Sequence, residues 1–221
     1  MLNPIFETVD QYISDLFIKK DDALDKITSN IETSGIPQIS VSANQGSLLQ
    51  ILALATGAKK ILEVGTLGGY STVWMARALP ADGKLITLEI DPKHAEVAKT
   101  NLKTAGQDHK VEIRLGKAID LLPQLEKEGA GPFDMIFIDA DKPPYAEYFQ
   151  WALKLSRPGT LIIADNVIRE GKVVNENESD EMVKGARRFN EVLSKETRVT
   201  ATIIQTVGEK LHDGIALAVV K

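Results

Sequence analysis

A short apolar run that ends in a glycine-rich turn constrains the fold of this chain more than any other stretch. Residues 61–64 read Ile-Leu-Glu-Val, and Gly65, Gly68 and Gly69 follow. Such a run is typical of a buried parallel strand, and glycine lets a backbone approach a ligand closely. The spacing is not the G-x-G-x-x-G dinucleotide fingerprint, and the turn holds no lysine for a phosphate. It therefore predicts a nucleotide-type pocket that is neither a dinucleotide site nor a P-loop.

After this turn, strand-like and helix-like segments alternate along the chain. Five apolar segments predict strands, at 60–64, 84–90, 110–114, 133–138 and 159–164. Helices are expected between them, at 70–79, 92–104, 117–127 and 144–156. This alternation predicts an α/β fold with a parallel sheet and helices on both faces. Residues 199–205 and 215–220 predict a closing antiparallel hairpin, so we expect the sheet to end mixed.

Three helices are expected before the first strand. The first spans residues 3–17, the second 21–33, and the third begins at Ser42 or Asn44 and ends near Gly57. For the first two we expect packing or a dimer surface. An acidic stretch at 175–181 leads into a last helix that ends near Ser194. With no repeat or linker, the 221 residues predict one domain, with helices at 1–57 and the core at 58–221.

Composition argues against several classes of protein. The net charge of −5 provides no basic surface for nucleic acid or an anionic membrane, so neither partner is expected. The absence of cysteine excludes disulfides, thiolate nucleophiles and cysteine-bound metals, and fits a reducing cytosol. The first residues lack the features of a signal peptide, and no apolar run is long enough to cross a bilayer. We therefore expect a cytoplasmic protein.

The carboxyl ends of the predicted strands are where a ligand is expected, because open parallel sheets bind ligands there. Glu89 ends the second strand, 24 positions after Gly65. This is near the ~20-residue spacing of a ribose-binding acid. The turn at 116–120 follows the third strand and could lie against a flat base. We expect Asp91 and Asp120 to be ordinary helix N-caps.

Acidic and amide side chains follow the fourth and fifth strands. Asp139 ends one of them, and Asp165 and Asn166 end the next. A single acid at a strand end is commonly structural, whereas acids at two successive strand ends favour a metal site. An all-oxygen cluster suits Mg²⁺, Mn²⁺ or Ca²⁺ and not zinc. No histidine joins it, and we expect surface or packing roles for His94, His109 and His212.

These motifs together resemble one enzyme family. Residues 63–71, Glu89, residues 139–142 and residues 165–167 resemble the cation-dependent O-methyltransferases. That is the caffeoyl-CoA and catechol O-methyltransferase group of the S-adenosylmethionine-dependent enzymes, and the resemblance covers nearly the whole chain. It implies a Rossmann-like class I methyltransferase fold, with a seven-stranded, mostly parallel sheet whose last strand is antiparallel. It also implies a homodimer.

The resemblance further implies a role for each residue of the motifs. It places S-adenosylmethionine contacts at Val41, Glu63, Gly65, Thr66, Ser71, Glu89, Ala118 and Asp139. Of these, Glu89 would hold the ribose and Ala118 would line the adenine. The metal ligands would be Asp139, Asp165 and Asn166, and Lys142 matches the family's general base. Gln45 and Asp141 depart from the pattern of some members, which affects the identity of the substrate and not the reaction.

The implied reaction transfers a methyl group from S-adenosylmethionine to a hydroxyl of an ortho-dihydroxy phenol, such as a flavonoid or hydroxycinnamoyl compound. Mg²⁺, or Mn²⁺ or Ca²⁺ in its place, would bind both hydroxyl oxygens, and S-adenosylhomocysteine would be released. Two alternatives remain open: methylation of a hydroxylated tRNA uridine, and a non-catalytic cofactor-binding protein. The acidic composition argues against the first, and the Asp139, Lys142, Asp165 and Asn166 set argues against the second.

Overall fold

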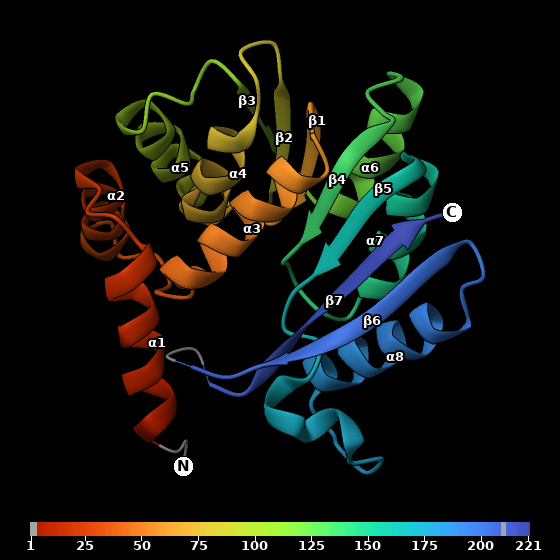
Figure 1. The fold of residues 1–221 in the computed structure, drawn as a ribbon. Helices are drawn as coiled ribbons and strands as arrows, with labels where there is room; N and C mark the ends of the chain where they lie inside the picture. Colours follow the sequence, from red (N-terminus) through yellow and green to blue (C-terminus); the bar gives the residue numbers. More distant parts are fainter. Residues whose placement is uncertain (1–3, 209–210) are drawn as a thin grey trace.

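The protein folds around one seven-stranded sheet in a computed structural model that describes residues 4–208 and 211–221 (Figure 1). Asn3, the first residue of the predicted N-terminal helix, lies outside these ranges. The strands are β1 (Lys60–Val64), β2 (Lys84–Glu89), β3 (Val111–Leu115), β4 (Phe133–Ile138), β5 (Ser156–Ala164), β6 (Val199–Thr206) and β7 (Asp213–Val220). The helices are α1 (Pro4–Phe17), α2 (Asp22–Thr33), α3 (Ala43–Ala55), α4 (Tyr70–Ala78), α5 (Pro92–Thr104), α6 (Ala118–Lys127), α7 (Tyr145–Lys154) and α8 (Glu181–Lys195), with a 3₁₀ turn η1 (Arg169–Val174).

The strand order is β3-β2-β1-β4-β5-β7-β6. The first five strands pair in parallel, and β7 runs antiparallel to both of its neighbours, β5 and β6. The predicted mixed sheet and its closing hairpin are therefore confirmed. The order reverses between β1 and β4, which are direct neighbours. Ligands of open α/β sheets bind at the carboxyl ends of strands at such a reversal.

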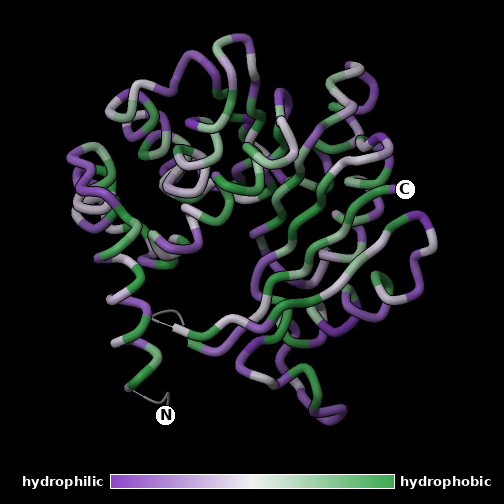
Figure 2. Tube along the Cα trace, in the orientation of Figure 1, coloured by the Kyte–Doolittle hydropathy of each residue, from purple (hydrophilic) through white to green (hydrophobic). Residues whose placement is uncertain are grey.

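Helices cover both faces of the sheet, where they form two cores, and α2, α4 and α5 form a third buried cluster that includes Ile27 and Trp74. On one face α6, α7 and α8 pack on the strands through buried side chains that include Leu122, Phe149 and Phe189. On the other face α3 and α4 bury Leu49 and Met75 against the strands. Figure 2 shows the apolar strands running between the more polar outer helices. Each buried large side chain contributes about 1.5–3 kcal/mol relative to an exposed one, so both cores hold the strand ends in place.

Helix α1 differs from the other α-helices because none of its residues is buried. It lies at the side of the molecule, below α2 in Figure 1, where the Nδ2 atom of Asn44 in α3 donates to the Asp10 carbonyl oxygen at 3.0 Å. Several of its apolar residues are exposed, Tyr12 and Phe17 most of all. Across the described ranges, no helix is both long and apolar enough to cross a membrane.

The structure corrects two expectations about local elements and adds one element that was not predicted. Strand β5 begins at Ser156 and not at 159, because Ser156 pairs with Phe133 before the Pro-Gly bend. Asp120 is not an N-cap, since α6 begins at Ala118 and Asp120 lies in its first turn. The segment after β5 contains η1, which was not predicted. Asp91 does cap α5, through its carboxylate and the Lys93 and His94 amides, as expected.

Candidate active site

The glycine turn after β1 lies directly against the end of β4. Gly65 has φ +101°, and a Cβ atom on it would lie 2.1 Å from the carbonyl oxygen of Asp139. Only glycine can occupy such a position, because a side chain would both strain the backbone and collide with the next strand. The turn therefore brings the end of β1 next to the first predicted metal ligand.

The buried carboxylate of Glu63, in β1, connects the start of this turn with α4 and β2. It accepts hydrogen bonds from Ser71 Oγ at 2.6 Å, Thr72 Oγ1 at 2.5 Å and Thr87 Oγ1 at 2.7 Å. Glu63 is fully buried, and the burial raises its pKa to about 7 although the three hydroxyls lower it. Because Glu63 is fully buried, its predicted contact with the cofactor would be made through Ser71, which lies in the first turn of α4.

Glu89 connects the end of β2 with the same turn. One of its oxygens accepts the amide protons of Leu67 at 2.8 Å and Thr66 at 3.2 Å, and the other accepts that of Asp91 at 2.9 Å. His94, expected to be a surface or packing residue, places its Nδ1 atom 3.5 Å from Glu89 Oε1. The predicted ribose-binding acid is thus already held in place against the turn.

The predicted oxygen cluster forms at the ends of β4 and β5. The Asp165 amide donates to the Ile138 carbonyl at 3.0 Å, which places Asp139 and Asp165 at the ends of paired strands. Asp165 is buried, and burial followed by the charge of Asp139 raises its pKa to about 7. Asn166 follows with φ +55°, an uncommon value for a residue other than glycine. Two carboxylates therefore lie at one edge of the sheet, and Asn166 directly follows the second.

Lys142 is buried beside this cluster. Its Nζ atom donates to Tyr145 Oη at 2.6 Å, to the Ala140 carbonyl at 3.0 Å and to Asp139 Oδ1 at 3.2 Å. The position that the resemblance assigns to a general base is thus within hydrogen-bond reach of a predicted metal ligand. A surface lysine, the ordinary structural alternative, is excluded by its burial.

The remaining two predicted cofactor residues stand at the starts of helices. Val41 is buried just before α3 and packs in the core that α3 and α4 form with the sheet. Ala118 begins α6 and packs, half-buried, against the core on the other face.

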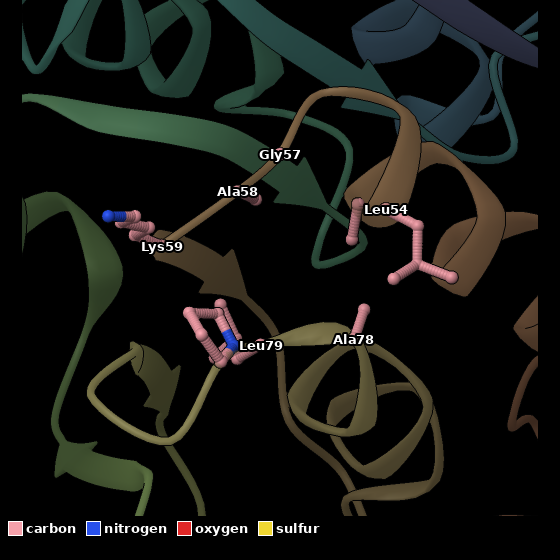
Figure 3. Close-up of a pocket in the computed structure, with 8 residues that line it drawn as sticks. Leu54, Gly57, Ala58, Lys59, Ala78 and Leu79 are labelled. Carbon is pink, nitrogen blue, oxygen red and sulfur yellow. The ribbon is translucent and has the colours of Figure 1, made fainter.

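A surface pocket near the amino end of β1, lined by Leu54, Gly57 and Leu79 among others, lies at the opposite end of the strand from the glycine turn (Figure 3).

Comparison with known proteins identifies the family. Residues 15–221 match the family model described as O-methyltransferase. The chain belongs to this O-methyltransferase family. A relative from Niastella koreensis named catechol O-methyltransferase is 66% identical over 221 residues, which is 100% of each chain.

Solved structures of O-methyltransferases agree with this assignment. One from Bacillus cereus, in complex with SAH, shares 50% identity with a TM-score of 0.97 and covers 99% of each chain. TomG from Streptomyces achromogenes, in complex with SAM, shares 48% identity with a TM-score of 0.95, covering 100% of this chain and 99% of that one. The predicted family, fold and enzyme class, an S-adenosylmethionine-dependent O-methyltransferase, are therefore confirmed.

The donor atoms of this methyltransferase fit a hard divalent cation. The predicted set consists only of carboxylate and amide oxygens, which Mg²⁺ prefers. Lys142 Nζ lies 3.2 Å from Asp139 Oδ1, and its charge also lowers the pKa of Asp165, so two carboxylates face this lysine and would attract an added cation. The described residues contain no group of three or more His, Cys, Asp or Glu that could hold a metal. The predicted ligand set is not such a group, because its third member is an asparagine, Asn166, in addition to the two acids.

Sequence reasoning missed Tyr145 and the contact that Gln45 makes in the site. Tyr145 is fully buried, and its hydroxyl lies 3.2 Å from the carbonyl oxygens of both Ile138 and Asp165 while accepting from Lys142. Gln45 donates through Nε2 to Asp165 Oδ2 at 2.6 Å. Tyr145 had a weak signal, because it lies three positions after Lys142 where a helix begins. Gln45 was named only as a departure from the family pattern, and nothing in the sequence connected it with Asp165, 120 positions away.

The pKa of Glu63 leads to a prediction about stability. A carboxyl whose pKa is about 7 when folded and near 4.5 when unfolded binds more protons in the folded state between these values. The free energy of unfolding should therefore fall as the pH rises from 5 to 8, by about 3 kcal/mol from this group. Glu63→Gln should remove this part of the pH dependence. Urea unfolding of both proteins in chelator would measure it, and a pH-independent difference between them would contradict the prediction.

Proposed function

We propose that this methyltransferase transfers the methyl group of S-adenosylmethionine to one hydroxyl of a catechol-like phenolic small molecule, in a reaction that requires a divalent cation such as Mg²⁺. Asp139, Asp165 and Asn166 would hold the cation. When bound there, the cation would supply positive charge that lowers the pKa of a phenolic hydroxyl and stabilises the phenolate. Mn²⁺ and Ca²⁺ favour the same oxygen ligands and are the other candidates.

Lys142 is the proposed proton acceptor. Its Nζ atom, in the neutral form, takes the proton of the hydroxyl that lies beside Asp139. The hydroxyl oxygen then attacks the methyl carbon, and the bond from that carbon to sulfur breaks. S-adenosylhomocysteine and the methyl ether are the products. Most of the rate enhancement would come from the fixed arrangement of two bound reactants.

The proposed cofactor residues lie in the glycine turn, at strand ends and in the segments that follow or precede the strands. Gly65 and Thr66 offer backbone at the turn, and Ser71 offers a hydroxyl that Glu63 orients. Glu89 would accept hydrogen bonds from the ribose, Ala118 would line the adenine, and Val41 and Asp139 would contact the methionine part. The SAH and SAM complexes of the Bacillus cereus and Streptomyces achromogenes relatives support S-adenosylmethionine as the cofactor.

One observation carries the proposal: a buried lysine lies within 3.2 Å of an acid at the end of β4, next to the acid and amide that end β5. A non-catalytic cofactor-binding protein would not need this set. The name of the Niastella koreensis relative, a catechol O-methyltransferase, supports a catechol-like substrate. The cysteine-free composition supports action in the cytoplasm.

A methyl-transfer assay tests the proposal. The purified protein would be incubated with S-adenosylmethionine and a panel of catechols, flavonoids and hydroxycinnamoyl esters, with Mg²⁺ or with excess chelator. We expect methylated products with Mg²⁺ and none in chelator. Full activity in chelator would contradict the cation requirement, and no product from any ortho-dihydroxy phenol would contradict the substrate class.

We also propose that the protein is a homodimer that forms through α1 and α3. Phe17 and Ile51 are 73% and 57% exposed, and Tyr12 and Leu54 add to the same two helices. Burial of such side chains would favour association. Phe17→Glu combined with Ile51→Glu should therefore give monomers by light scattering after size exclusion. The matched control, Val174→Glu, changes an exposed apolar residue outside α1 and α3 and should stay dimeric. A dimeric double variant would contradict the proposed interface.

A further inference from the structure

We propose that Gln45 is a positioning residue that orients the carboxylate of Asp165 for the divalent cation. The inference rests on the proposed metal-dependent function and adds a residue that lies outside the predicted ligand set. Gln45 lies in the first turn of α3, which is far from β5 in the sequence but next to the end of β5 in the fold.

The contacts of Asp165 assign this role to Gln45. Within the described ranges, the carboxylate of Asp165 accepts two hydrogen bonds. Oδ1 accepts one from the backbone N–H of Asn166 at 2.8 Å, and Oδ2 accepts one from Gln45 Nε2 at 2.6 Å. The first comes from the next residue in the chain and moves with it. The second is a tether to another element, and it fixes the direction in which the carboxylate points.

The first turn of α3 is itself held in place. Ser42 Oγ accepts the amide proton of Gln45 at 3.2 Å and caps the helix. Gly46 packs so tightly on α4 that a Cβ atom there would lie 2.4 Å from the Trp74 ring. Asn44 binds α1 through Asp10. Gln45 therefore extends from a fixed backbone, as a residue that positions another must.

The amide of Gln45 suits this purpose chemically. Each carboxylate oxygen can accept more than one hydrogen bond, so Oδ2 can be tethered while lone pairs of Asp165 remain for a cation. A neutral donor adds no positive charge that would repel the cation. Residues that hydrogen-bond to metal ligands commonly change metal affinity 10- to 100-fold when they are replaced.

A titration of the full chain with Mn²⁺, followed by the EPR signal of the free ion, tests the inference. Gln45→Met keeps the length of the side chain and removes the donor. We expect it to weaken Mn²⁺ binding about tenfold or more, while S-adenosylhomocysteine affinity and the melting temperature stay as in the wild type. Gln50→Met, in the same helix, is the matched control and should bind Mn²⁺ as the wild type does. Asp165→Asn identifies the site and should lose this binding.

A steady-state measurement adds a second readout. The Mn²⁺ concentration for half-maximal activity should rise in Gln45→Met, while kcat at saturating Mn²⁺ stays within a few-fold of the wild type. Equal Mn²⁺ affinity of Gln45→Met and wild type would overturn the role of Gln45 and leave the proposed function intact. Absence of Mn²⁺ binding to the wild type would overturn both.

Discussion

Asp165→Ala is expected to lower kcat/KM about 10³-fold or more while affinity for S-adenosylhomocysteine stays within about twofold. The reason is that Asp165 is the buried carboxylate of the proposed metal site, whereas the glycine turn that would hold the cofactor follows a different strand, β1. Metal charge contributes several kcal/mol to such a transition state, and each 1.36 kcal/mol is about tenfold in rate. Enzyme assays and calorimetric titration with S-adenosylhomocysteine would measure the two effects.

Two further variants separate loss of the metal from loss of structure. Asp165→Asn keeps the shape of the side chain, so it should be folded, bind S-adenosylhomocysteine and still be inactive. Asp108→Ala removes an exposed acid outside the predicted site and should leave activity unchanged. If Asp165→Asn keeps more than about a tenth of the wild-type rate, the proposed cation site is in the wrong place. Restoration of wild-type activity by Mg²⁺ after chelation would complete the test.

The bounds of the strands could be predicted from the sequence where the strands are buried in the centre of the sheet. The predicted bounds of β1 and β4 match the structure because central parallel strands are continuous apolar runs between polar residues. The start of β5 was not readable, because Pro158 and Gly159 look like a boundary while the chain already pairs at Ser156. Local turn chemistry and strand pairing point to different residues there.

The position of the candidate site could be predicted from the topology of the sheet. Parallel strands present their carboxyl ends at one edge, so Asp139 and Asp165 could be placed together once the strands were assigned. Contacts between side chains from distant elements could not be placed in this way. The bond from Gln45 to Asp165 and the complete burial of Glu63 both depend on how α3 and α4 pack on the sheet.

Lys142→Met is expected to lower kcat about 10²–10⁴-fold with little change in S-adenosylhomocysteine or Mn²⁺ binding. The side chain reaches Asp139 Oδ1 and is held by Tyr145 Oη, so Nζ is fixed beside the proposed cation site. Methionine removes the proton acceptor and keeps an unbranched apolar stem. Single-turnover assays at saturating phenol, cofactor and Mg²⁺ would measure the chemical step directly.

Lys142→Arg decides between a proton acceptor and a fixed positive charge. Arginine keeps the charge beside Asp139 but stays protonated, so it cannot accept the proton of a hydroxyl. If Lys142 is the base, the arginine variant should be about as slow as the methionine variant. If it only balances the two carboxylates, the arginine variant should keep most of the activity and the methionine variant should not. Because Lys142 is buried, both variants need a melting temperature and an S-adenosylhomocysteine affinity near those of the wild type for this comparison. A fast arginine variant that meets these conditions would therefore assign the proton to another acceptor, such as water.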